Sequence, residues 1–214
     1  ALGVSRTVVR EALMLLEEDG LIVTKRGVGR FVSESIPHEG ELDEFQPLEF
    51  LLAEPGTSLH VTVVEFTLQK ATDFVTDHLG LTASEDFWFR ECVVARDGVP
   101  VALVQEYLPD EARLAALNEA VSRELQDAAR QPSTLLQALT ERVGPVFSAG
   151  LCRVGASVAG RTRGTLLGVK STDPLLVLTQ TAELAGVAAY TTKCALPPAF
   201  GHLAVSQWKP SHSR

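Results

Sequence analysis

Two runs of β-forming residues meet at Asp97-Gly98, and this junction constrains the fold more than any other feature of the chain. The run FWFRECVVAR precedes the dipeptide, and VPVALVQEYLP follows it. Asp-Gly between two β-rich runs is typical of a two-residue hairpin turn. A second hairpin is expected at Ala185-Gly186, between LLVLTQTAEL and VAAYTTKCAL. Strands joined by hairpins pair antiparallel, so these runs predict an antiparallel sheet.

Helical segments lie between these strands. Apolar spacing predicts longer helices over 110–130 and 133–144 and shorter ones over 71–80 and 160–169. Further strands are expected over 60–71 and 147–158. Hairpins with helices inserted between them indicate an α+β domain, in which an antiparallel sheet has helices on one side.

The first 33 residues have a different pattern. Ser5 can cap a helix, and apolar residues then recur at helical spacing from Val8 to Leu16. Arg6, Thr7 and Arg10 fall on the opposite side of that helix. The segment 21–32 reads as a β-hairpin with a basic tip. A helix with arginine and threonine near its start suits the major groove of DNA, although amphipathic helices with a solvated face are common.

Charge divides the chain into three parts. Residues 1–33 carry five basic and four acidic side chains, a net charge of +1, whereas residues 34–54 carry seven acidic and no basic ones, a net charge of −7. Residues 55–214 carry fourteen basic and sixteen acidic side chains, a net charge of −2. We therefore expect an acidic linker over 34–54 between an N-terminal unit and a larger domain over 55–214.

Several classes of protein do not fit this composition. No apolar run approaches the 18 residues of a membrane span, and no signal segment opens the chain. Cys92, Cys152 and Cys194 form no CxxC pair, and the histidines are scattered, so neither a disulfide framework nor a metal site is expected. Reduced thiols favour a cytoplasmic protein without a cofactor.

The N-terminal stretch LGVSRTVVREALMLLEEDGLIVTKRGVGRFV resembles the second half of the winged helix-turn-helix of the GntR family of bacterial regulators. The matching features are LGVSR-T, V-REAL, L-x-x-DGL and the closing G-x-G-x-FV. The first helix and most of the second helix of such a unit are not in the chain, which is expected to start within it. The resemblance implies contacts with operator DNA from Ser5, Arg6, Thr7, Arg10, Arg26 and Gly27, together with Lys25 and Arg30.

Residues 55–214 resemble the UTRA effector-binding domain of the HutC-like branch of that family. The resemblance rests on ARDGVPVALVQEYLP, STLLQAL, TLLGV and DPLLVLTQTAELAGVAAY. Such domains have a chorismate-lyase-like fold, pair into homodimers and bind a small metabolite that changes the affinity for the operator. The resemblance therefore implies a homodimer with an effector in its C-terminal domain.

This chain departs from the family where many relatives bind an anion. An Arg-x-Arg pair is replaced by Cys92 and Val94, and a glutamate on the next strand by Val104. Because a buried anion without a cationic partner is strongly disfavoured, we expect a less charged pocket that does not take a sugar phosphate. Other departures from the family pattern are Thr134, Leu136 and Tyr190. The polar side chains that remain to orient an effector are Gln105, Tyr107, Thr134, Arg153, Thr181, Glu183 and Tyr190.

The sequence thus predicts a homodimeric, ligand-responsive regulator, in this family more often a repressor, that binds a two-fold symmetric operator. One alternative is a stand-alone ligand-binding or oligomerisation module with a non-functional DNA-binding remnant. A chorismate-lyase-like enzyme is the other alternative, but no Ser-His-Asp set, carboxylate pair or metal cluster occurs at a recognisable spacing. We therefore expect no catalytic residues.

Overall fold

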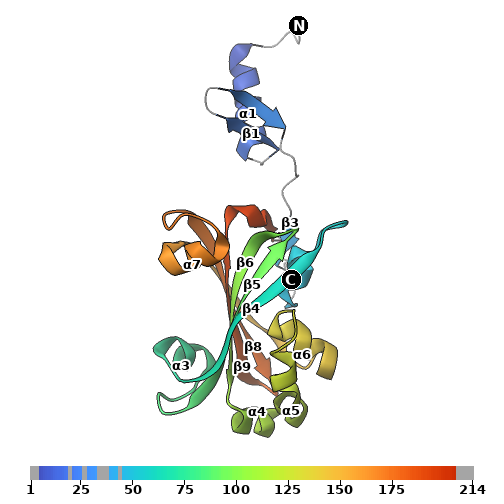
Figure 1. Ribbon diagram of the computed structural model, residues 1–214, viewed down its shortest axis with the longest axis vertical. Coiled ribbons are helices and arrows are strands. Elements are labelled where there is room, and N and C mark those ends of the chain that lie inside the picture. The colour runs from blue at the N-terminus through green and yellow to red at the C-terminus, as the bar shows by residue number, and fades with distance from the viewer. Residues whose placement is uncertain (1–4, 19–20, 26–27, 33–38, 43–44, 206–214) are drawn as a thin grey trace, which may run out of the picture.

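The N-terminal unit is a helix followed by a β-hairpin (Figure 1). The computed structural model describes residues 5–18, 21–25, 28–32, 39–42 and 45–205. The Ser5 hydroxyl accepts a hydrogen bond from the Val8 amide at 3.3 Å, which caps the helix as expected. The elements of this unit are α1 (Arg6–Glu18), β1 (Ile22–Lys25) and β2 (Gly29–Val32), and the two strands pair antiparallel.

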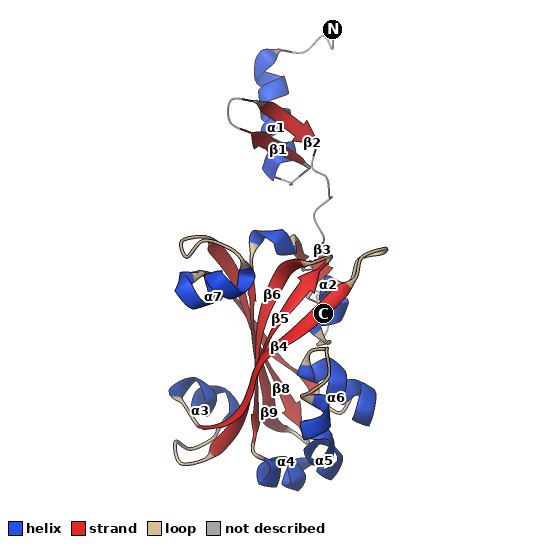
Figure 2. Ribbon diagram, in the orientation of Figure 1, coloured by secondary structure: helices blue, strands red, loops and turns tan. Residues whose placement is uncertain are grey.

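A six-stranded antiparallel sheet forms the centre of the larger domain (Figure 2). Its spatial order is β4-β5-β6-β9-β8-β7, so each expected hairpin supplies two neighbouring strands. The confirmed sheet consists of β4 (Leu59–Lys70), β5 (Asp86–Arg96), β6 (Val99–Pro109), β7 (Ser148–Val158), β8 (Pro174–Leu184) and β9 (Val187–Leu196).

The two hairpin turns have the same backbone conformation. Asp97 and Gly98 have φ values of 50° and 82°, and Ala185 and Gly186 have values of 53° and 79°. Positive φ at both central residues is the mark of a type I′ turn, whose twist matches that of the flanking strands. The sequence prediction of both hairpins is therefore confirmed.

Helices cover both faces of the sheet (Figure 2). The first face packs against Leu114, Leu125 and Leu139 of the longer helical segments, as expected for one helical layer. The two short helices expected over 71–80 and 160–169 are present, but they lie on the second face and not with this layer: Leu79 packs with Phe87 and Leu167 packs with Leu103. The helices of the first face are α4 (Glu111–Leu117), α5 (Glu119–Ala128) and α6 (Leu135–Val143), and those of the second face are α3 (Asp73–Leu79) and α7 (Gly160–Leu167).

The acidic segment contains regular structure in its described part. Strand β3 (Glu39–Glu41) pairs parallel with β10 (His202–Ala204), which follows the 3-10 helix η1 (Pro198–Phe200). Helix α2 (Leu48–Leu52) then buries Leu48, Leu51 and Leu52 against the first face of the sheet, while Phe50 stays exposed. The end of this segment is therefore part of the packed domain.

Candidate functional site

The sheet register brings polar residues from distant parts of the chain into one row across the first face. Arg90 lies opposite Glu106, Glu106 opposite Thr192, and Thr192 opposite Gln180. The adjacent row on that face contains Cys92, Val104 and Cys194. Because side chains two residues apart on a strand share a face, both rows point toward α2 and α6.

Arg90 and Glu106 form a fully buried ion pair, with 2.8 Å between Nη1 and Oε2. The remaining guanidinium donors bind three backbone carbonyl oxygens and one sulfur. Nε donates to Ala129 at 3.0 Å, Nη2 donates to Gln131 and Ser133 at 3.0 and 2.7 Å, and Nη1 also donates to Cys92 Sγ at 3.7 Å. Burying a charge is tolerated only when its hydrogen-bonding groups are satisfied. The guanidinium is therefore committed to structure rather than offered to a ligand.

The Glu106 carboxylate also binds the start of α6. It accepts hydrogen bonds from the amides of Leu135 and Leu136 at 2.9 and 3.1 Å and from the hydroxyl of Tyr190 at 2.7 Å. The first amides of a helix have no partner within the helix, and their partial positive charge favours an anion. The protein's own carboxylate thus occupies this anion-binding position.

A second carboxylate reaches the same helix end from α2. Glu49 accepts hydrogen bonds from the Thr134 amide at 2.5 Å and from the Thr134 hydroxyl at 2.7 Å. Burial raises the pKa of Glu49 despite these hydrogen bonds, and the charge of Glu106 adds to that rise. This contact fastens the end of the acidic segment to α6.

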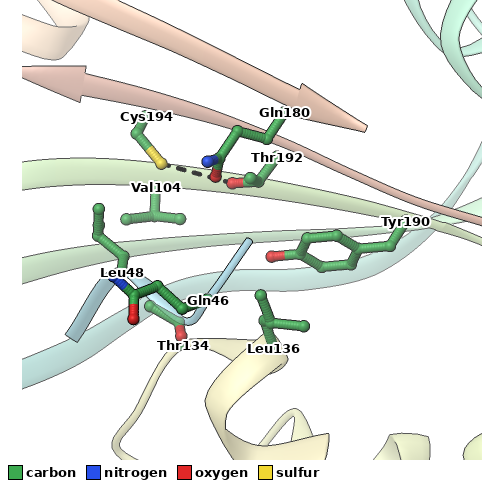
Figure 3. Close-up of a pocket in the computed structure, with 9 residues that line it drawn as sticks. All are labelled: Gln46, Leu48, Val104, Thr134, Leu136, Gln180, Tyr190, Thr192 and Cys194. Carbon is green, nitrogen blue, oxygen red and sulfur yellow. Dashed lines mark hydrogen bonds between the residues drawn. The ribbon is translucent and has the colours of Figure 1, made fainter. Parts of the chain in front are cut away.

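A narrow pocket lies between α2, the start of α6 and the sheet (Figure 3). The space within it measures about 210 Å³ including the part that is open to solvent, and the side chains leave room for about one water molecule. In Figure 3 the sheet residues face the residues of the linker and of α6 across this space. The pocket is lined by Gln46, Leu48, Val104, Thr134, Leu136, Gln180, Tyr190, Thr192 and Cys194.

The lining of this pocket is uncharged at neutral pH. None of the described residues that line it is an aspartate, glutamate, lysine or arginine. Burial raises the pKa of Cys194 to about 12 and raises the pKa of Tyr190 well above its usual range, so both groups stay protonated. The described lining residues can therefore offer a ligand hydroxyl, amide and apolar contacts, and none of them offers an ionic contact.

The structure brings together four of the residues expected to bind an effector: Val104, Thr134, Leu136 and Tyr190. Cys92 and Val94 lie on the same face but are buried in the core beside α2. The other expected residues lie elsewhere: register places Gln105, Tyr107, Arg153 and Thr181 on the second face, and Glu183 is exposed at the end of β8.

The sequence interpretation missed five lining residues and the buried pair behind them. Gln180 lies two residues from the buried Leu178 and Ala182, and a polar residue on an otherwise apolar strand face could have marked it as facing a pocket. The same holds for Thr192, which lies two residues from Tyr190 and Cys194. Gln46 and Leu48 carry no such signal, because they come from the acidic segment far from the sheet strands in sequence. The missed lining residues are Gln46, Leu48, Gln180, Thr192 and Cys194.

The candidate DNA-binding residues are exposed where the structure describes them. Ser5, Arg6, Thr7 and Arg10 lie along the first turns of α1. Arg30 on β2 lies 3.7 Å from the Glu17 carboxylate and donates to the Thr24 hydroxyl at 3.3 Å. The structure describes the backbone of Lys25 but not its side chain, and Arg26 and Gly27 lie outside the described residues.

Two family profiles match the chain in the same order as its structural units. The UTRA domain matches residues 54–197, and the bacterial regulatory proteins of the gntR family match residues 1–32. Each match falls on one of the units described above.

Two curated relatives are regulators. The mannosyl-D-glycerate transport/metabolism system repressor MngR of Escherichia coli K12 is 31% identical over 109 residues, which are 50% of this chain and 44% of MngR. The HTH-type transcriptional regulator Rv0792c of Mycobacterium tuberculosis is 28% identical over 180 residues, which are 84% of this chain and 63% of Rv0792c. The chain thus spans less than two thirds of the length of either relative.

A solved structure has the same fold. The crystal structure of PhnF from Mycobacterium smegmatis superposes with a TM-score of 0.68 at 20% sequence identity, covering 97% of this chain and 87% of PhnF. Within the described residues, no helix is long and apolar enough to cross a membrane, and no three His, Cys, Asp or Glu residues gather as metal ligands. The chain belongs to the GntR-type transcriptional regulators that carry a UTRA domain.

Proposed function

We propose that this chain acts in a homodimeric transcriptional repressor whose affinity for its operator is set by a small molecule bound against the first face of the sheet. The observation that carries this proposal is the position of Gln46 and Leu48, which line the pocket and belong to the segment that connects the GntR unit to the sheet. A ligand in the pocket touches the connection to the DNA-binding unit directly.

Because the pocket is small, a ligand that enters it must move part of the wall. With room for about one water molecule, the pocket admits a larger ligand only if part of its wall moves. The sheet wall is held by the antiparallel ladders of β6, β8 and β9, whereas α2 shares no ladder with it and is held by its buried leucines and by the Glu49–Thr134 contact. We infer that the ligand displaces α2 and the residues before it. Such a ligand controls DNA binding if it binds the two positions of α2 with different affinity.

The chemistry of the site favours an uncharged effector. The donors of Arg90 are bound to Glu106 and to three carbonyl oxygens, and the amides at the start of α6 are bound to Glu106 and Glu49. A phosphate in the pocket would lose its hydration without gaining a cation, which is strongly unfavourable. We therefore propose that the effector is not a sugar phosphate.

The DNA-binding surface is proposed to be the exposed start of α1 together with the hairpin tip. Arg6 and Arg10 lie one turn apart and point away from the apolar side of α1, in a position to pair with guanine in the major groove. Ser5 and Thr7 would contact phosphate or a thymine methyl group, and Lys25, Arg26, Gly27 and Arg30 would contact the backbone or an adjacent groove.

A homodimer would place two such surfaces on a two-fold symmetric operator. Ligand-free repression is the proposed direction of control, and the relative MngR is named a repressor. Release of the operator on ligand binding would then turn transcription on.

The DNA-binding proposal is tested by selecting an operator from a random duplex library with the full-length protein, followed by fluorescence anisotropy. We expect the selected sequence to be two-fold symmetric. Arg6→Ala and Arg10→Ala should each weaken binding by about 1–3 kcal/mol, roughly 5- to 150-fold. Arg161→Ala, an exposed arginine on α7, is the control and should leave the affinity unchanged. Wild-type affinity in both α1 variants would exclude α1 as the recognition helix.

A further inference from the structure

A second, larger cavity lies beside the narrow pocket, between the end of the acidic segment and α6. The space within it measures about 570 Å³ including its open mouth. Its walls are mainly aromatic and proline side chains from residues 45–50 and 145–147, and the ring of Phe50 is 62% exposed. An exposed aromatic side chain at the mouth of an apolar cavity suits binding of an apolar group.

The two cavities share walls. Gln46 and Leu136 line both of them. Tyr190 lines the narrow pocket and packs against two rings of the larger cavity: its centroid lies 6.4 Å from that of Phe45 and 5.5 Å from that of Phe147. The walls of the two spaces are therefore continuous through Gln46, Leu136 and Tyr190.

The polarity of the joined space changes along its length. The inner end holds the side chains of Gln180, Thr192 and Thr134, which are hydrogen-bonding but uncharged. At the outer end the described lining residues are aromatic, proline and aliphatic except for Gln46 and Thr140. No charged side chain lines either cavity among the residues that the structure describes.

We propose that the two cavities form one effector site for an uncharged amphipathic molecule, with a hydrogen-bonding head in the inner pocket and an aromatic or aliphatic body in the outer cavity. This inference rests on the proposed function and names the chemical class of its effector. The body occupies space that is already open, and the head displaces the side chains that close the inner pocket. Because Gln46 borders both spaces, head and body both act on the linker.

A matched pair of probes tests this assignment. Isothermal titration of the full-length protein compares 4-phenylbutanamide with 4-phenylbutyrate, which have the same length but differ in charge. We expect the amide to bind at least about tenfold more tightly than the carboxylate, because no cation in the site compensates a buried anion. Glucose 6-phosphate, the third probe, should show no binding.

Variants locate the bound probe. Phe147→Ala removes an aromatic wall of the outer cavity, and Thr140→Trp fills that cavity; each should weaken amide binding about tenfold or more. Leu151→Ala, on the exposed part of β7, is the control and should bind like the wild type. Thermal unfolding of each variant checks that it is folded. If Phe147→Ala does not fold, Thr140→Trp still tests whether the probe binds in the outer cavity.

The proposal is overturned by any of three results: tighter binding of the carboxylate or of glucose 6-phosphate, unchanged amide binding in Phe147→Ala and Thr140→Trp, or no amide binding at millimolar concentration. Operator affinity without any probe is measured in parallel. Failure of the probes with intact operator binding rejects this effector class alone, whereas loss of operator binding rejects the proposed function.

Discussion

Ala185 is the one described residue other than Asp97 and the glycines that has a positive φ, at 53°. Asparagine tolerates this left-handed conformation much better than alanine, which pays roughly 1 kcal/mol in it, and Asn-Gly is the preferred type I′ pair. Ala185→Asn should therefore raise the free energy of unfolding by about 0.5–1 kcal/mol in urea denaturation. Ala53→Asn, at an exposed residue with φ −69°, is the control and should give no gain. A loss of stability in Ala185→Asn would contradict the turn assignment.

Glu49 makes the α2 contact depend on pH. Because its pKa is raised in the folded protein, its contribution to stability is fully present below the usual value of 4.5 and is lost as the pH rises through the folded pKa. The difference in unfolding free energy between wild type and Glu49→Gln should therefore favour the wild type more at pH 4 than at pH 7.5, as measured by urea denaturation at both values.

Glu85 supplies a control, because its pKa is shifted in the direction opposite to that of Glu49. Hydrogen bonds from the amide and hydroxyl of Thr82 lower the pKa of Glu85, with a further contribution from Arg113. Its contribution is present above 4.5 and is lost as the pH falls through the folded pKa, so Glu85→Gln should show the reverse pH dependence. The same trend in both variants would show that the Glu49 effect is not specific to the burial of that carboxylate.

At the level of elements, the start of α6 is held to the sheet by the Arg90–Glu106 pair. Removing one partner leaves a buried charge uncompensated, so Glu106→Gln should lower the free energy of unfolding by about 3–5 kcal/mol in urea denaturation. Asp127→Asn, which weakens solvent-accessible contacts with Arg130 and Arg142, should cost at most about 1 kcal/mol. A loss below about 1 kcal/mol in Glu106→Gln would contradict the structural role of the pair.

The elements themselves were predictable because their signals are local. Turn residues marked both hairpins, and Asn118, whose side chain accepts from two amides at the start of α5, splits the expected helix over 110–130 in two. The α+β class and the antiparallel sheet follow from these signals alone. The helices on the second face could not be assigned to it in advance, because a short amphipathic helix has one apolar side whichever face it packs on.

The site was less predictable than the elements, because the pairing register of the strands determines which side chains lie next to one another. If β5 and β6 paired without a bulge from the Asp97-Gly98 turn onward, Arg90 would lie opposite Gln105. A β-bulge at Val94/Ala95 shifts the pairing by one residue, so that Arg90 faces Glu106 instead. A second bulge, between Ala182 and Glu183, similarly sets the partner of Tyr190. No turn residue in the sequence marks either bulge, which is why the buried pair was missed.

The alternation of side chains along a strand explains why several of the expected effector-binding residues do not lie together. Val104 faces the pocket, so Gln105 points to the second face, where its amide donates to Glu91 at 2.8 Å. Tyr107 is on that face too, packed against Phe74 at a centroid distance of 5.0 Å. Choosing polar residues from both faces of a strand could not yield one site, because neighbouring side chains on a strand point in opposite directions.

At the scale of the whole molecule, one segment connects the two matched units. The matched GntR unit ends at residue 32 and the UTRA match begins at residue 54, so the pocket residues Gln46 and Leu48 lie between the two matches. We propose that a ligand that moves this segment changes the affinity of the DNA-binding unit for its operator. By thermodynamic linkage, DNA binding must then change the affinity for the ligand by the same factor.

This reciprocity gives the most direct test of the account. The dissociation constant of 4-phenylbutanamide is measured by isothermal titration of the full-length protein, alone and in the presence of a saturating amount of the selected operator duplex. A duplex of scrambled sequence is the control. We predict that the operator weakens amide binding by about 5- to 150-fold, corresponding to a coupling of about 1–3 kcal/mol. Equal dissociation constants with and without the operator would contradict the proposed coupling.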